Sequence, residues 1–199
     1  MPATCALATC MAAAVPCLAS GWAAAPAPGH LLFQNGRSDY VIAVPKAADR
    51  LVVYAAGELQ RYLKLAGGAD IPVVDADCRP AGRPAVCVGR GAHPASASLP
   101  KDAPPQSFFI RSIGDDIVLY GADPIGSSNA VFHFIETQLG VRWYMPFDLW
   151  EYLPPRRASL CIRPLDITEI PSFVQRDLKY VWANWITPDQ KRDYDLWRL

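Results

Sequence analysis

The chain has 199 residues, 51% of them hydrophobic, and its 19 basic side chains balance its 19 acidic ones. This apolar fraction suffices for one folded domain with a core of its own. A neutral chain without runs of like charge gives no electrostatic reason to expect a nucleic acid or an anionic membrane surface as partner.

The segment before Arg37, the first charged side chain, is rich in Ala, Leu, Val and Cys. Its apolar part is short, is interrupted by Pro16, and is followed by A-x-A patterns at Ala23–Ala25 and Ala25–Ala27, which is typical of a secretory signal peptide. It is too poor in large apolar side chains for a membrane span, which needs ~20 apolar residues. We therefore expect residues 1–27 to be a signal peptide and the protein to be secreted or periplasmic, with no membrane contact after cleavage. Because this segment lacks Lys and Arg, an Ala-rich leader or a misassigned start codon remains as an alternative.

The next segments predict an alternation of strands and helices. Apolar side chains recur at helical spacing over Ala48–Ala66, which predicts a helix that ends at Gly67-Gly68. We expect Gly57, in the middle of this helix, to allow close packing on a sheet. β-Branched and apolar runs predict strands at Asp39–Pro45, Ile71–Asp75 and Ala85–Gly89.

Turn-forming residues dominate the following segment. Arg90–Gln106 is rich in Pro, Ala and Ser and is predicted to be an exposed loop. Residues 107–121 predict a hairpin that turns at Gly114-Asp115-Asp116.

A second helix is predicted over residues 123–140, capped by Ser127 or Ser128 and ended by Gly140. Its buried stripe is Val131, Phe134, Ile135 and Leu139. A last strand follows at Ser159–Pro164. This order predicts an α+β domain over residues 30–166, with a mixed β-sheet and two helices packed on one face.

Cysteine and histidine give no metal-binding pattern. His30, His93 and His133 are scattered, and no C-x-x-C pair occurs, so we expect no metal and no cofactor. After the leader the cysteines are Cys78, Cys87 and Cys161. Because three is odd, at least one thiol is free or pairs between chains. Cys87 lies in an apolar run and is expected to be buried.

The polar candidates for catalysis have structural interpretations. Ser127 and Ser128 lack the G-x-S-x-G context of a nucleophile and are interpreted as helix caps. Asp115 and Asp116 are interpreted as turn residues, because a glycosidase acid pair needs carboxylates about 5–10 Å apart on a rigid frame. We therefore expect no catalytic residue in this chain.

Aromatic side chains gather in two groups. The first is Trp143, Tyr144, Phe147, Trp150 and Tyr152, and the second is Tyr180, Trp182, Trp185, Tyr194 and Trp197. Such side chains beside Arg and Asp suit sugar stacking and interdomain packing equally well. We expect packing for the first group, and both interpretations stay open for the second.

Three segments taken together resemble a known family. They are VYAAGELQRYLKLAGGADIPVV (residues 53–74), GADPIGSSNAVFHFIETQLGVRWYMP (121–146) and PSFVQRD (171–177). The first two resemble the amino-terminal domain of family 67 alpha-glucuronidases and of bacterial proteins in domain-of-unknown-function family 4838. The third resembles the P-x-F-x-x-R element that opens the catalytic barrel of these proteins. The likeness runs from about Tyr40 onward.

The resemblance implies a fold and a role for each part of the chain. The first domain is similar to the small domain that precedes the barrel in beta-hexosaminidases, and it carries no catalytic residues. A catalytic (β/α)8 barrel follows it, and Arg176 holds the place of an arginine that contacts the sugar. Arg176 is therefore the residue that the resemblance assigns to substrate binding.

About thirty residues follow Pro171, whereas a barrel needs about 200 or more. We therefore expect residues 167–199 to be an incomplete first unit of the (β/α)8 barrel, truncated before the catalytic acids. The chain would then be inactive by itself, with a carbohydrate partner only in a full-length enzyme. A stand-alone carbohydrate-binding or interaction module is the alternative, and a complete small hydrolase is a third hypothesis.

Overall fold

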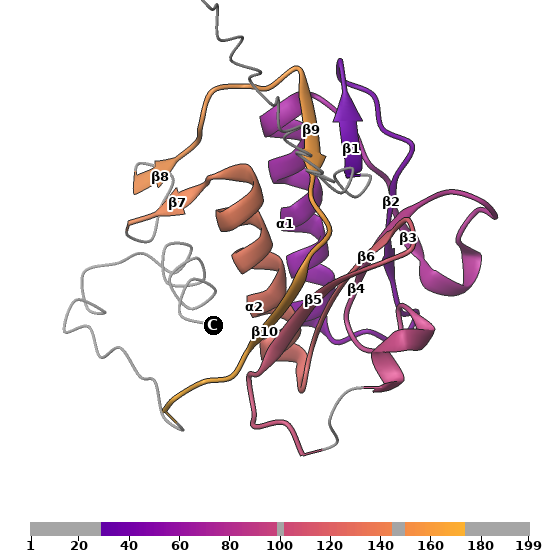
Figure 1. Ribbon diagram of the computed structural model, residues 1–199, viewed down its shortest axis with the longest axis vertical. Coiled ribbons are helices and arrows are strands. Elements are labelled where there is room, and N and C mark those ends of the chain that lie inside the picture. Colours follow the sequence, from indigo (N-terminus) through magenta and orange to yellow (C-terminus); the bar gives the residue numbers. More distant parts are fainter. Residues whose placement is uncertain (1–28, 99–101, 145–149, 174–199) are drawn as a thin grey trace, which may run out of the picture.

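Figure 1 shows the computed structural model, which describes residues 29–98, 102–144 and 150–173. The strands are β1 (His30–Gln34), β2 (Val41–Val44), β3 (Val73–Asp75), β4 (Ala85–Val88), β5 (Phe108–Ile113), β6 (Asp116–Gly121), β7 (Arg142–Trp143), β8 (Glu151–Tyr152), β9 (Ser159–Ile162) and β10 (Asp166–Glu169). The helices are α1 (Arg50–Gly67) and α2 (Pro124–Phe134), which continues as the π-helical turn η3 (Ile135–Leu139). The 3-10 turns are η1 (Ala76–Cys78) and η2 (Pro94–Ser98).

The main sheet is mixed. Its strand order is β10-β5-β6-β4-β2-β3, and the neighbours from β6 to β3 run parallel. Strands β5 and β10 add antiparallel pairs at the other edge. Two small antiparallel ladders, β1–β9 and β7–β8, lie outside this sheet.

Both helices lie on one face of the sheet, as predicted. In Figure 1 they stand side by side. One continuous core joins the buried stripes of α1 and α2 to the sheet residues Ile42, Val86 and Leu119. The predicted stripe of the second helix is confirmed, because Val131, Phe134, Ile135 and Leu139 are all fully buried. The expected α+β architecture is therefore present.

The helix ends agree only partly with the sequence. Gly68 and Gly140 end the two helices in the left-handed conformation, with φ of 79° and 82°. The predicted serine cap of the second helix is wrong, because Asp123 is the N-cap and accepts from the backbone N–H of Gly126 at 2.7 Å. Ser127 is buried, and its hydroxyl accepts from the Gly121 N–H at 3.0 Å. Asp123 rather than a serine is the N-cap because its carboxylate reaches the free backbone amides of the first turn, and because Pro124 suits the first helical position.

Gly57 does not pack on the sheet as expected. It is exposed, and a Cβ built on it would meet no atom within 4 Å. Close approach occurs instead at Gly121, where a Cβ would lie 2.3 Å from the backbone of Gly126. Here the end of β6 and the start of α2 nearly touch, so glycine is needed at both positions.

The helix-free face of the sheet is covered by loops. Val41, Ala43, Cys87, Val118 and Tyr120 form its buried layer. The segment Arg90–Gln106 was expected to be exposed throughout, and this is wrong in part. Ala92 and Ala103 pack against this layer, and Ser96 is 2% exposed. A proline-rich loop is buried here because no helix covers this face of the sheet.

The first and last strands pair with partners that are far away in the sequence. Strand β1 was not predicted, and it pairs with β9, far along the chain. Strand β10 pairs with β5 through residues 166–169, so it crosses the predicted boundary between residues 166 and 167. The main sheet thus includes residues up to Glu169. Among the helices of the described residues, none is long and apolar enough to cross a membrane.

Candidate functional site

The β7–β8 hairpin carries the first aromatic group on two opposite faces. Arg142 lies opposite Tyr152 and Trp143 opposite Glu151, and the Tyr144 N–H donates to the Trp150 carbonyl at 3.1 Å. Residues opposite each other in an antiparallel ladder share a face, and successive residues alternate. The outward face therefore holds Arg142, Tyr144, Trp150 and Tyr152, and the inward face holds Trp143 and Glu151.

Exposure agrees with this register. The outward aromatic side chains are open to solvent, at 67% for Tyr144, 46% for Trp150 and 50% for Tyr152. Trp143 is half-buried, and the Glu151 side chain is 9% exposed. The packing expected for the first aromatic group is thus present within this domain for Trp143. Exposure of the other three leaves both interdomain packing and sugar stacking open to them, and Phe147 lies outside the described residues.

The inward face fastens the hairpin to α1. The Trp143 indole N–H donates to the Tyr62 hydroxyl at 2.7 Å, and the two rings meet edge to face with centroids 5.4 Å apart. Phe132 also packs edge to face against Trp143, with ring centroids 5.5 Å apart. The Arg61 guanidinium lies 4.2 Å from the Tyr62 ring centroid and 3.5 Å from the Glu151 carboxylate. We call Arg61, Tyr62, Trp143 and Glu151 the hairpin latch.

The electrostatics of the latch keep Tyr62 protonated. Burial of its hydroxyl, followed by its hydrogen bond to Glu151, raises the pKa of Tyr62 well above the ordinary value. The phenol therefore stays neutral at physiological pH and serves as a hydrogen-bonding hub. The latch holds the hairpin so that its outward rings face solvent together.

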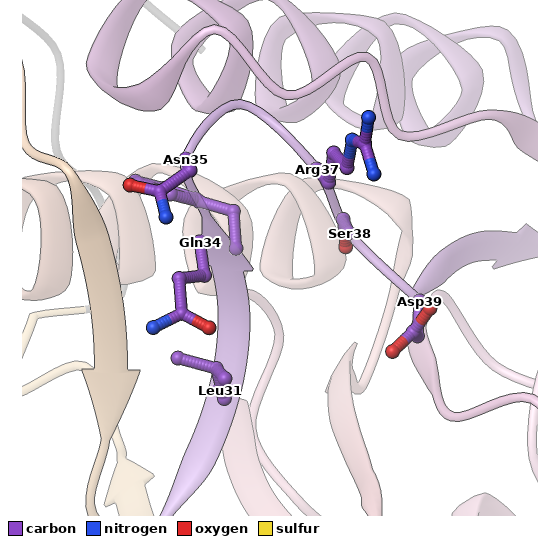
Figure 2. A pocket seen from close by; sticks show the side chains of 7 residues that line it. Leu31, Gln34, Asn35, Arg37, Ser38 and Asp39 are labelled. Atoms are coloured by element: carbon purple, nitrogen blue, oxygen red, sulfur yellow. The ribbon is translucent and has the colours of Figure 1, made fainter.

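A polar groove lies beside β1. Figure 2 shows Leu31, Gln34 and Asn35 along β1 and its turn, and Arg37, Ser38 and Asp39 along the segment that leads to β2. The groove encloses about 560 Å³ and is open to solvent. It lies at a different place from the hairpin, because in Figure 1 β9 and α1 stand between the two.

Asp115 lies in the predicted hairpin turn, whereas Asp116 is the first residue of β6 and makes contacts that the turn interpretation did not include. Asp116 is 8% exposed and accepts two hydrogen bonds from Arg79, at 2.5 and 2.7 Å, and a third from the Ala85 N–H at 2.9 Å. His93 Nε2 lies 3.6 Å from the same carboxylate. The carboxylate therefore pins two loops to the start of β6. No motif spacing marks this contact, because its partners come from separate loops.

This cluster has no activated nucleophile. Cys87 lies near the Arg79–Asp116 pair, and burial, followed by the charge of Asp116, raises the pKa of its thiol to about 12. A thiol with such a pKa remains protonated and unreactive. His93 Nδ1 accepts from the Ala95 N–H at 3.1 Å, so one ring nitrogen is already used.

The cysteines and histidines considered as candidates lie in different elements and loops of the described structure. Cys87 is buried, as predicted, and the described part of the chain contains no disulfide. His30 lies 3.1 Å from the Tyr40 hydroxyl, and His133 packs against Phe108 at the edge of the core. Within the described ranges, no three His, Cys, Asp or Glu side chains come together as metal ligands. Arg176, the signal peptide and the second aromatic group lie outside the described residues, so the predictions made for them stay predictions.

No protein-family model matches the chain, and a search of curated proteins found no match.

Proposed function

We propose that this chain contains the non-catalytic amino-terminal domain of a secreted glycoside hydrolase, and that the outward face of its β7–β8 hairpin packs against the catalytic (β/α)8 barrel. The residues that follow β10 would begin that barrel, with Arg176 at its substrate site. The enzyme class rests on the three motifs that resemble family 67 alpha-glucuronidases. The docking role rests on the hairpin.

The observation that carries the proposal is the solvent exposure of Tyr144, Trp150 and Tyr152 together on a fastened hairpin. Large aromatic side chains left in water forgo their hydrophobic stabilisation, and a cluster of them marks an interaction surface. Trp, Tyr and Arg are also the residue types that contribute most to protein interfaces, and Arg142 completes the set. A latch that fixes their positions lowers the entropy lost on docking.

Two further features support the proposal. The mixed sheet with both helices on one face has the architecture that the resemblance implies for the first domain. Ile170 and Phe173, which follow β10, expose 55% and 73% of their surface. These apolar side chains lie in the segment that would begin the barrel, and a complete barrel would cover them.

The alternative is a carbohydrate-binding module that uses the same outward face. Exposed rings of Tyr and Trp beside the charged Arg142 also suit the apolar face and the hydroxyls of a sugar. This role differs from docking in needing no second domain.

A chimaera tests the proposal. Residues 30–173 replace the amino-terminal domain of a family 67 alpha-glucuronidase, and a second version carries Tyr144→Ser, Trp150→Ser and Tyr152→Ser. We expect the first version to be active and the second to lose thermal stability and activity. Val53→Ser, which changes an exposed apolar side chain of α1, is the matched control. Equal stability and activity of all versions would refute docking through the hairpin.

Assays of the isolated chain distinguish a complete hydrolase from a carbohydrate-binding module. We expect the chain to hydrolyse neither aryl glucuronides nor aryl hexosaminides, and turnover would identify a complete hydrolase. Saturable binding of oligosaccharides that is lost on Trp150→Ala would favour the carbohydrate-binding module.

A further inference from the structure

The polar groove beside β1 has a rigid frame. The turn after β1 is closed by two hydrogen bonds between Gln34 and Arg37, of 2.9 and 3.0 Å. Asn35 and Gly36 take φ of 49° and 76°, as an Asn-Gly hairpin turn requires. The Asn35 N–H donates to the Ala158 carbonyl at 2.6 Å, which ties the turn to the segment before β9. The backbone of the groove is therefore held from both sides.

The side chains of the groove have hydrogen-bonding capacity to spare. Within the described residues, the side chains of Gln34, Asn35, Arg37 and Asp39 form no hydrogen bond or ion pair, whereas Ser38 is used up by the Leu32 carbonyl and the Tyr40 N–H. The two amides supply both donors and acceptors, Asp39 accepts, and Arg37 donates. A hydroxyl group also does both, so this mixture matches a ligand with many hydroxyl groups.

The charges and the apolar surface of the groove further limit the class of ligand that it can bind. Among the described residues, the lining carries one guanidinium, from Arg37, and one carboxylate, from Asp39, and these two charges balance. A strong anion would gain from Arg37 but would be repelled by Asp39. Leu31, which is 46% exposed, offers an apolar wall for C–H groups. A volume of about 560 Å³ is within the usual range of small-molecule sites.

We propose that this groove binds a neutral saccharide unit, held by Gln34, Asn35 and Asp39 with Leu31 as its apolar wall. The described lining residues include no exposed aromatic ring, so hydrogen bonds rather than stacking would provide the selectivity. The inference does not rest on the proposed docking role, because groove and hairpin are separate surfaces.

The test is a ¹⁵N NMR titration of the full chain with xylotriose and cellotriose, and with sodium glucuronate as a charged comparison. We expect saturable shifts of the Gln34 and Asn35 side-chain amides with at least one neutral sugar, and weaker or absent shifts with glucuronate. The double variant Gln34→Ala/Asp39→Ala should weaken binding about tenfold, since each lost hydrogen bond costs a few-fold. Asn35→Gly removes a further amide while keeping the left-handed turn.

Tyr152→Ser is the matched control, because it alters the hairpin and leaves the groove intact. The groove variants change exposed side chains without partners in the described structure, so a dispersed spectrum is expected for each. The inference is overturned if neither neutral sugar gives saturable shifts, or if glucuronate binds as well as they do. It is also overturned if the groove variants bind like the wild type, or if Tyr152→Ser abolishes binding and so moves the site to the hairpin.

Discussion

Removing one hydroxyl group from the hairpin latch should loosen the proposed docking surface. Tyr62 is 2% exposed, and its hydroxyl accepts from the Trp143 indole N–H at 2.7 Å and bonds to the Glu151 carboxylate. Tyr62→Phe keeps the ring and its edge-to-face contact. It leaves an indole N–H and a mostly buried carboxylate without this partner.

The expected loss of stability comes from the indole N–H and the carboxylate that lose this partner. A buried polar group that loses its partner costs about 1–3 kcal/mol, and Arg61 still compensates Glu151 in part. We therefore expect a loss of about 2 kcal/mol in the free energy of unfolding. For a domain of this size that corresponds to a fall of about 6–8 °C in Tm.

The assays are urea denaturation for the free energy of unfolding and hydrogen exchange for residues 142–144 and 150–153 of the hairpin. Exchange in the hairpin should rise more than exchange in the main sheet, because the latch is its attachment to α1. Tyr120→Phe is the matched control, since Tyr120 is equally buried and its hydroxyl has no hydrogen bond within the described ranges. If Tyr62→Phe cost no more than Tyr120→Phe, or left hairpin exchange unchanged, the reasoning about the latch would be wrong.

Other parts of the fold give further predictions. Gly57→Ala should stabilise the protein by about 0.5–1 kcal/mol, because alanine favours a helix more than glycine does and its methyl group would meet no other atom. Gly121→Ala should cost at least about 2 kcal/mol, because its methyl group would overlap the backbone of Gly126. Thermal melts compare the two variants, and an unchanged Tm of Gly121→Ala would contradict the close approach. Asp116→Ala should cost about 2 kcal/mol, since it removes the ion pair with the partly buried Arg79 and leaves the Ala85 N–H without its acceptor, and a loss below about 1 kcal/mol in urea denaturation would argue against a stabilising role of Asp116. Burial, then nearby carboxylates, raises the pKa of Tyr40 to about 12 from 10.0, so its contribution is complete below pH 10 and lost as the pH rises to about 12. Denaturation across this range should show falling stability that is less steep in Tyr40→Phe, and equal slopes would refute the assignment.

Local signals explain the parts of the fold that the sequence predicted well. The helical spacing from Val52 to Leu63 and the glycine at residue 68 mark α1 without help from the rest of the chain. The same holds for the hairpin of β5 and β6, whose strands are neighbours in sequence. Non-local pairing explains the misses, because β1 is a strand only by virtue of β9 and β10 only by virtue of β5.

The candidate site, too, has features that the sequence predicts and features that depend on non-local contacts. Composition identified the aromatic group around Trp143, but which rings face outward depends on the register of β7 with β8. The Arg79–Asp116 contact joins the residue after η1 to the first residue of β6, far along the sequence, so no spacing rule reveals it. The groove beside β1 was missed because its strand was missed.

The most direct test of the central claim is hydroxyl-radical footprinting of the hairpin, with modification rates read by mass spectrometry. The full chain is compared with the active chimaera that carries a family 67 barrel. We predict rapid modification of Tyr144, Trp150 and Tyr152 in the chain and a several-fold slower rate in the chimaera, with Tyr54 on α1 unchanged. Equal rates for the three outward rings in both proteins would contradict the claim that this face docks on the barrel.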